Sequence, residues 1–413
     1  MSTGAIDTTS SATTDAPTDA PAAAGRAARP RLPLVVHVLA LGTFLMMTTE
    51  FVVAGILPEV ADGLGVSLAR AGSLITTFAV GMVVGAPLMT VLTMRLSKRA
   101  TLVVAMAVFV VGHVVVALSE SFTVLIVARL VTAFATGAFW AVSAVVATRA
   151  AGPGAGARAL GVVSAGAALA TVAGVPLGAL VAQLLGWRGT FWFLAVAGAA
   201  AAVLIARKVP ADAGDGAALP LRASLAGLRS GRLWLALLAC VTTTGGVLAA
   251  FSFIAPILTD QGGVPASLVP MVLTGFGIGS FAGTLLGGRF GDARPGPVTI
   301  LTPAVSTVLL AGIAVVSDAP WPMTALVVLL GLFGLSANGV LIHLAVSHAG
   351  EAASFGSALT VSAFNLGTAI GSAVAGATLA TPLGTHGPAA VGAVVVALTL
   401  VPTTALALLR RRP

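Results

Sequence analysis

Two charged residues in otherwise apolar runs are the first to suggest chemistry. Glu50 lies seven residues before the end of one run at Leu57, and Arg129 lies six residues after the start of another run at position 123. If both runs are membrane helices, a rise of 1.5 Å per residue places both charges about 9–10 Å from the same membrane surface. A lone charge at the bilayer centre costs roughly 2.5–3.5 kcal/mol on an insertion scale, so such residues are paired, hydrated or functional.

A carboxyl group near a guanidinium offers two interpretations. In the first, the pair is a buried ion pair that fixes helix packing. In the second, Glu50 loads and unloads a proton while Arg129 biases its charge state, because an apolar environment favours the neutral carboxyl and a nearby positive charge favours the carboxylate. The sequence leaves both open.

Other polar and aromatic side chains lie in the same apolar runs. His113 falls at a similar depth, either as a structural histidine or as a proton relay. Each of the others is either a cavity-lining group or a packing residue, and the candidates for a substrate cavity are Thr43, Met46, Met47, Thr136, Trp140, Phe251, Phe253, Asn338 and Asn365. The chain shows no phosphate-binding loop, zinc-protease motif or nucleophile–base arrangement, so we expect neither an ATP-driven pump nor an enzyme.

The composition shows what must position these residues. Of the 413 residues 58% are hydrophobic and only 8% are charged, against about 25% charged in soluble domains. A soluble enzyme is therefore excluded. Twelve segments are long and apolar enough to cross a bilayer: 34–57, 70–93, 101–118, 123–147, 159–185, 190–206, 233–258, 268–287, 298–316, 321–346, 354–380 and 389–409.

The basic residues predict an orientation. With the N-terminus inside, 18 of the 21 Lys and Arg residues fall on the cytoplasmic side, and only Arg70 and Arg188 fall outside. This bias is typical of membrane proteins with both termini in the cytoplasm. The net charge of +8 is thus a topology signal, and we expect no nucleic-acid partner. The single cysteine, Cys240, excludes a disulfide within the chain and a thiolate metal site.

The segments divide into two similar halves. We expect a disordered tail at 1–31, a six-helix bundle at 32–206, a cytoplasmic linker at 207–232 and a second bundle at 233–413. A shift of 198 residues superimposes Pro58, Phe78, Gly81 and Gly85 on Pro256, Phe276, Gly279 and Gly283. The same shift aligns Glu50 with Leu248, so only the first half carries this charge. This asymmetry favours a specific function for Glu50 over a requirement of the fold.

Small residues recur every four positions in the fifth and eighth segments. The fifth segment carries Gly174 and Gly178 on one face with Pro176 between them. Small residues let two helices approach closely in lipid, and proline weakens the helix. The pattern predicts either tight static packing or a hinge.

Five stretches carry a family resemblance: TEFVVAGILPEVADGLGVS (49–67), FAVGMVVGAPLM (78–89), ARLVTAFATGAFWAV (128–142), TVAGVPLGALVAQLLGWRGTFW (171–192) and GFGIGSFAGTLLGGRFGD (275–292). They resemble the twelve-span drug:proton antiporter branch of the major facilitator superfamily, and in particular the actinobacterial chloramphenicol-efflux and arabinose-efflux-like exporters. The resemblance covers nearly everything from 32 to 412.

The resemblance implies roles for particular residues. Arg129 matches the arginine of the family's fourth span, and Glu50 matches an acidic residue of the substrate and proton cavity. Gly174, Pro176 and Gly178 match the antiporter motif, although the proline is displaced by one position. The cytoplasmic gate loop of the first half is degenerate, because it keeps only the basic residues of the family motif, Arg95, Lys98 and Arg99. The corresponding loop of the second half keeps the acidic residue, Asp292.

These observations give a combined expectation. The fold is an all-α membrane protein of twelve transmembrane helices in two six-helix bundles. The function is proton-coupled export of small, largely apolar molecules, with antibiotics of the chloramphenicol type among them, by a monomer in the bacterial cytoplasmic membrane without a cofactor other than protons. Export of a sugar, a nucleoside or a self-made metabolite is the alternative, and a non-transporting sensor or scaffold on the same fold is a remote one.

Overall fold

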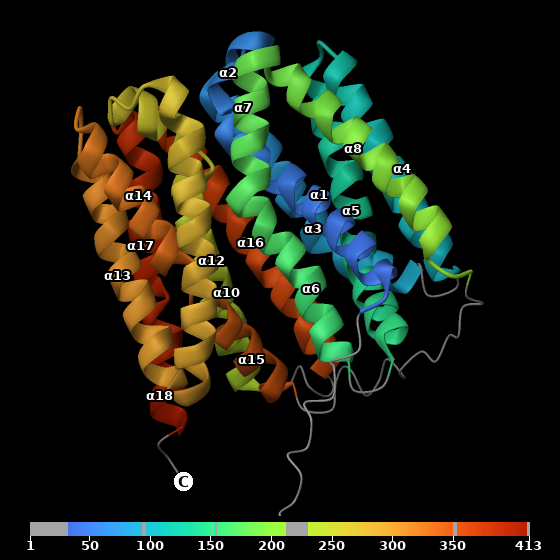
Figure 1. Cartoon of the computed structure of the whole chain (residues 1–413). Helices are drawn as coiled ribbons and strands as arrows, with labels where there is room; N and C mark the ends of the chain where they lie inside the picture. The colour runs from blue at the N-terminus through green and yellow to red at the C-terminus, as the bar shows by residue number, and fades with distance from the viewer. Residues whose placement is uncertain (1–31, 93–95, 153–154, 212–229, 350–352, 411–413) are drawn as a thin grey trace, which may run out of the picture. The chain divides into compact units, whose positions relative to one another are not determined.

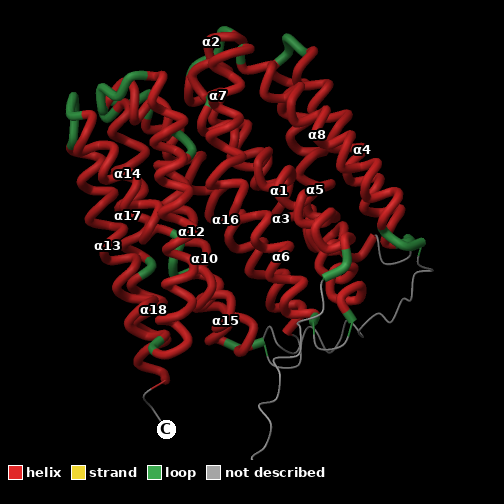
Figure 2. The backbone as a smooth tube through the Cα atoms, in the orientation of Figure 1, coloured by secondary structure: helices red, strands yellow, loops and turns green. Residues whose placement is uncertain are grey.

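The computed structural model describes residues 32–92, 96–152, 155–211, 230–349 and 353–410 (Figure 1). Within these ranges every regular element is a helix, as the tube in Figure 2 shows. Among the described residues, twelve helical segments are long and apolar enough to span a membrane, which confirms the predicted all-α class and the count of twelve. The tail at 1–31, most of the linker, and Arg95 lie outside the described residues.

The helices of the first half follow the predicted segments closely. The spans are α1 (Leu34–Gly55), α3 (Leu68–Leu92), α4 (Lys98–Leu118), α5 (Phe122–Ala151), α6 with α7 (Gly156–Leu169 and Val175–Leu185) and α8 (Trp187–Lys208). The short helix α2 (Leu57–Leu64) joins α1 to α3.

The second half repeats this order. Its spans are α10 (Gly231–Phe251), α12 (Val269–Ala293), α13 (Pro295–Val315), α14 with α15 (Pro320–Gly334 and Asn338–His348), α16 (Ala353–Thr378) and α17 with α18 (Gly387–Leu398 and Leu400–Arg410). The short helix α11 (Ile254–Pro256) and a π-helical turn (Ile257–Gln261) follow α10.

Proline explains where the seventh span departs from its prediction. The apolar run extends to 258, but α10 ends at Phe251. Pro256 has no N–H to donate to the carbonyl four residues back, so an uninterrupted helix cannot pass through it without losing a bond. In the first half, Pro58 occupies the same relative place just after α1 ends at Gly55.

Helix packing follows the internal repeat as well. In the first half α3 packs on α5, and in the second half α12 packs on α14. Gly81 lies against Leu130 and Ala133 of α5, while its counterpart Gly279 lies against the backbone of α14 at Val328. Matching glycines therefore lie at the contacts of matching helix pairs.

Contacts also join the halves of the chain. Residues 33–413 form one compact unit, in which α16 packs on α3 and α12 packs on α6 and α7. Thr76 and Ser372 share a hydrogen bond of 2.8 Å across the first of these seams, and Ser362 donates to the carbonyl oxygen of Val83 (3.2 Å). The division into two six-helix bundles stays a prediction.

Candidate functional site

The α-helix of the fifth span is interrupted near the site. Between α6 and α7 the chain forms a π-helical turn at Ala170–Gly174, and the N–H of Val175 bonds to the carbonyl of Ala170, five residues back. Pro176, directly after this turn, has no N–H to continue a regular ladder. The predicted weak point at Pro176 therefore lies at a real irregularity of the helix.

Arg129 is buried on α5 and reaches across to α1. Only 2% of its surface is exposed. Its Nη1 donates to the carbonyl oxygen of Thr49 (2.8 Å) and to the hydroxyl oxygen of the same residue (3.1 Å). One amino group of the guanidinium thus binds the residue directly before Glu50.

The rest of the guanidinium contacts an aromatic ring and makes no further hydrogen bond among the described residues. Its central carbon lies 4.2 Å from the centre of the Phe78 ring, a cation–π contact. Its Nε and Nη2 are buried and have no hydrogen-bond partner among the described residues. Glu50 directly follows Thr49, to which the guanidinium is bonded, but these two arginine nitrogens make no bond to its carboxyl group. The predicted pair is close without a direct hydrogen bond.

Glu50 lines a small cavity between the two halves of the chain. The lining comes from α1, α3, α10 and α16 and includes Phe51, Phe78, Phe251 and Thr368. About 10 Å³ of the cavity admits a water-sized sphere, which is room for about one water molecule. Phe251 meets Phe51 edge to face at 6.3 Å and stacks on a further ring at 4.7 Å. Glu50 is therefore the ionisable group among the lining residues of a small, mostly apolar cavity with three phenylalanines in its wall.

A second polar chain runs from Thr49 to α4. The Thr49 hydroxyl lies 2.7 Å from Nε2 of His113, and Nδ1 of His113 lies 2.6 Å from the carbonyl oxygen of Phe109. His113 is 2% exposed, and its ring lies between the rings of Phe109 and Phe191, with centroids 4.0 and 5.9 Å away. His113, predicted at a similar depth to Glu50 and Arg129, thus lies in the same region, and Thr49 bonds both His113 and Arg129.

The remaining cavity candidates lie in separate places. Met46 and Thr136 meet, with the Thr136 hydroxyl 3.3 Å from the Met46 sulfur. Phe253 does not line the Glu50 cavity; it is fully buried against Gly72 and Gly376.

The polar members bond mostly within their own helices. Thr43 is buried and donates to the carbonyl of Leu39, whereas Met47 and Trp140 are half-buried. Asn338 and Asn365 each keep a buried side-chain oxygen without a hydrogen-bond partner among the described residues. Their substrate-binding roles stay predictions.

The glycines of the fifth span pack on α1. A Cβ at Gly174 would overlap the Thr48 hydroxyl, and one at Gly178 would overlap Val52. On the other side of the same break, Gly277 of α12 touches the backbone of Thr171. The irregular turn is therefore enclosed by α1 and by a helix of the second half.

The gate-loop candidates are only partly described. Lys98 and Arg99 form the first turn of α4, where the Ser97 side chain accepts a hydrogen bond from the N–H of Ala100. Asp292 lies in the last turn of α12, and its side chain lies outside the described part, as does Arg95.

A further acidic residue lies just beyond the first span. Glu59 is in the first turn of α2, and one of its carboxyl oxygens is buried without a hydrogen-bond partner among the described residues. Burial raises the pKa of Glu59 above its usual range; a backbone hydrogen bond opposes this rise, and nearby Asp62 adds to it.

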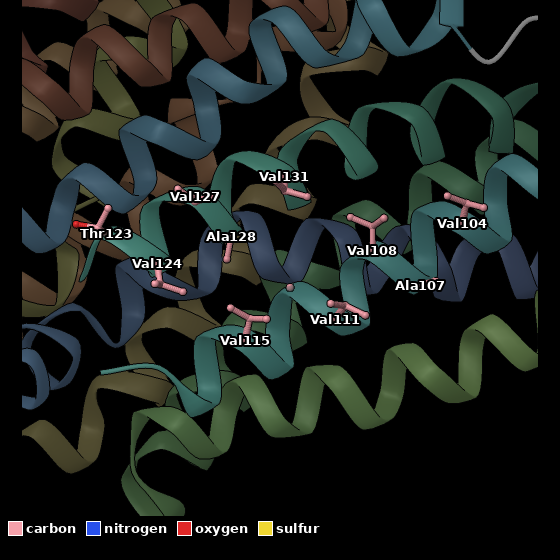
Figure 3. Close-up of a pocket in the computed structure, with 11 residues that line it drawn as sticks. Val104, Ala107, Val108, Val111, Val115, Thr123, Val124, Val127, Ala128 and Val131 are labelled. Atoms are coloured by element: carbon pink, nitrogen blue, oxygen red, sulfur yellow. The ribbon is translucent and has the colours of Figure 1, made fainter. Parts of the chain in front are cut away.

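A much larger groove lies away from these charges. It runs between α4 and α5, has a volume of about 560 Å³ and is lined mainly by valines, as Figure 3 shows. Val104, Val111 and Val127 are more than half exposed there. In a bilayer, lipid chains cover such an apolar face. We therefore place the candidate site at Glu50 and Arg129.

The sequence profile of the Major Facilitator Superfamily matches residues 39–372. The chain belongs to this superfamily. A chloramphenicol resistance protein of Streptomyces lividans is 36% identical over 372 residues, which is 89% of this chain and 95% of the relative. The putative transporter AraJ of Escherichia coli is 33% identical over 341 residues, 82% of this chain and 86% of the relative.

The superfamily fold also appears among solved structures. A bacterial homologue of the human lysosomal transporter Spinster, in an inward-facing and unoccupied conformation, superposes with a TM-score of 0.70 at 16% identity. The match covers 91% of this chain and 96% of that one. This chain is thus a multi-pass membrane transporter of the superfamily, and the resemblance predicted from its motifs is confirmed.

Proposed function

We propose that this transporter exports small, largely apolar molecules, chloramphenicol-like antibiotics among them, in exchange for protons that move inward. The observation that carries the proposal is the position of Glu50, the ionisable group among the lining residues of a small, mostly apolar cavity built from both halves of the chain. The name of the Streptomyces lividans relative supports the substrate class.

The proposed cycle uses groups that the chain itself provides. Glu50 binds a proton when the cavity opens outward and releases it when the cavity opens to the cytoplasm. Arg129 stabilises the carboxylate after release, because its Nε and Nη2 are free of other partners in the described part of the chain. The aromatic walls formed by Phe51 and Phe251 receive the apolar part of the substrate, and rocking of the two halves exposes it on alternate sides.

The first prediction concerns Glu50→Gln, which keeps the side-chain shape and removes the titratable group. We expect this variant to insert normally and to lose export driven by a proton gradient. The measurement is chloramphenicol uptake into inverted vesicles with an acidic interior. Glu120→Gln is the matched control, because Glu120 is exposed in the loop between α4 and α5 and should transport like the wild type. Full gradient-driven transport by Glu50→Gln would remove this carboxyl from the mechanism.

A drug panel in a sensitive host tests the substrate class. We expect expression of the transporter to raise resistance to chloramphenicol-like compounds and a protonophore to abolish the effect. In the vesicle assay, unlabelled compounds can also compete with transport. Inhibition by sugars or nucleosides, without inhibition by apolar drugs, would instead indicate a metabolite exporter. Resistance that persists with the protonophore would contradict proton coupling.

A further inference from the structure

The hydrogen bonds of His113 determine which of its ring nitrogens carries a proton. The carbonyl oxygen of Phe109 can only accept, so Nδ1, at 2.6 Å from it, carries the hydrogen. In a neutral ring Nε2 is then an acceptor, and the Thr49 hydroxyl donates to it at 2.7 Å. The hydroxyl oxygen in turn accepts from Nη1 of Arg129. Every donor in this chain of bonds points from Arg129 toward α4.

Two other threonines of α1 show what Thr49 would do without His113. The hydroxyls of Thr43 and Thr48 donate to carbonyl oxygens four residues back, at 3.0 and 2.7 Å. This is the usual bond of a threonine within a membrane helix. Thr49 makes no such bond, because its hydrogen goes to His113 on a different helix. Without that acceptor, its hydroxyl would turn toward the carbonyl of Leu45 and away from Arg129.

We propose that His113 is a positioning residue for Arg129, which it holds beside Glu50 through the Thr49 hydroxyl. The inference rests on the proposed function, because the position of Arg129 matters for transport only if Glu50 carries the proton. His113 contacts neither substrate nor Glu50 in this scheme. Its place between the rings of Phe109 and Phe191 keeps the imidazole plane fixed.

Two substitutions separate this role from simple packing. In His113→Gln the side-chain oxygen takes the place of Nε2 and can still accept from Thr49. In His113→Asn the side-chain nitrogen takes the place of Nδ1 and can still bond Phe109, but nothing reaches Thr49. Both variants lose the ring, so their packing defects are similar. We expect the Gln variant to keep most of its proton-driven export and the Asn variant to lose about tenfold of its maximal rate.

Loss of the hydrogen bond and loss of folding should affect transport differently. Proton-driven uptake of chloramphenicol into inverted vesicles should fall in His113→Asn, with its KM changed less than about threefold. Exchange of labelled for unlabelled chloramphenicol without a gradient should continue. Thr49→Val should match His113→Asn, and the double variant should be no worse than either, because both remove the same bond. Thr132→Val is the control, since the Thr132 hydroxyl donates to carbonyl oxygens of its own helix, at Ala128 and Arg129.

A measurement that needs no transport completes the test. Nitrogen-15 NMR of the purified protein should show one histidine with its proton on Nδ1 and a hydrogen-bonded Nε2, and Thr49→Val should shift that Nε2 signal. A proton on Nε2, equal defects in the Asn and Gln variants, or an Asn variant with wild-type transport would overturn the inference. Wild-type vesicles that ignore the proton gradient would refute the proposed function instead, and the NMR result would then decide the inference alone.

Discussion

Arg129 is bound to α1 through one amino group of its forked, planar guanidinium. One amino group reaches both oxygens of Thr49, the central carbon covers the Phe78 ring, and the other nitrogens remain available to Glu50. A planar guanidinium can make these contacts at once because its donors are spread over three nitrogens. An ammonium group is a compact charge that cannot cover the Phe78 ring and bond both oxygens of Thr49 in the same way.

Arg129→Lys should therefore restore little. We expect proton-driven export to fall roughly 10- to 100-fold, because bonds to a charged group contribute about 1.5–3 kcal/mol, while the charge of the site is unchanged. The measurement is the gradient-driven rate in vesicles, beside the amount of inserted protein. Arg188→Lys is a suitable control, because Arg188 stacks on Trp187 at the start of α8 and, among the described residues, does not contact Thr49 or Phe78. An Arg129→Lys variant with wild-type rate would show that charge alone is required.

At the residue scale, the sequence identifies the charged residues of the site but not the side chains that contact them. Glu50 and Arg129 stand out because a charge in a membrane helix has a high cost. Thr49 and Phe78 carry no such signal, since a buried threonine usually bonds its own helix and a phenylalanine is ordinary in an apolar segment. Their roles depend on which helices meet, and this follows from packing between positions 80 residues apart.

Among the helices, α12 makes a close backbone contact with the break in the fifth span, and this seam joins the two halves. Gly277 of α12 lies against the backbone of Thr171 and Val172, within the π-helical turn. The proline in this span made a weak point predictable. The interruption of the tenth span between Gly334 and Asn338 was not predictable in the same way, because no proline marks it.

Gly277→Ala should disturb this seam. A Cβ there has no flexible neighbour to displace, because the atoms that it meets belong to the backbone, and overpacking of this kind costs about 1–3 kcal/mol. We expect a lower thermal unfolding temperature in detergent and slower export. Gly288→Ala in the same helix is the matched control, since nothing lies within 4 Å of its Cβ position, and it should be neutral or slightly stabilising. Equal behaviour of the two variants would mean that the seam is not a close contact in the working protein.

Charge placement is the main signal at the scale of the whole molecule. The ends of alternate helices meet as an alternating topology requires: Arg70 at the start of α3 covers the Phe122 ring at the start of α5 (5.0 Å), and Arg188 donates to Ser119 at the end of α4 (3.2 Å). Arg232 at the start of α10 donates to Leu409 near the end of α18 (3.3 Å). These contacts group the helix ends, and the excess of basic residues predicts that the group with Arg232 faces the cytoplasm.

Single cysteines test that orientation directly. The native Cys240 is fully buried and should not react with a membrane-impermeant maleimide, so the wild type is its own background control. Glu120→Cys, in the exposed loop between α4 and α5, should be labelled in intact cells, because the basic-residue bias places this loop outside. Ala211→Cys, exposed after α8, should be labelled only once the membrane is permeabilised. The reverse pattern would invert the topology. It would also place the cavity of Glu50 nearer the cytoplasm, so that protons would reach this carboxyl from the opposite side and the proposed direction of exchange would no longer follow.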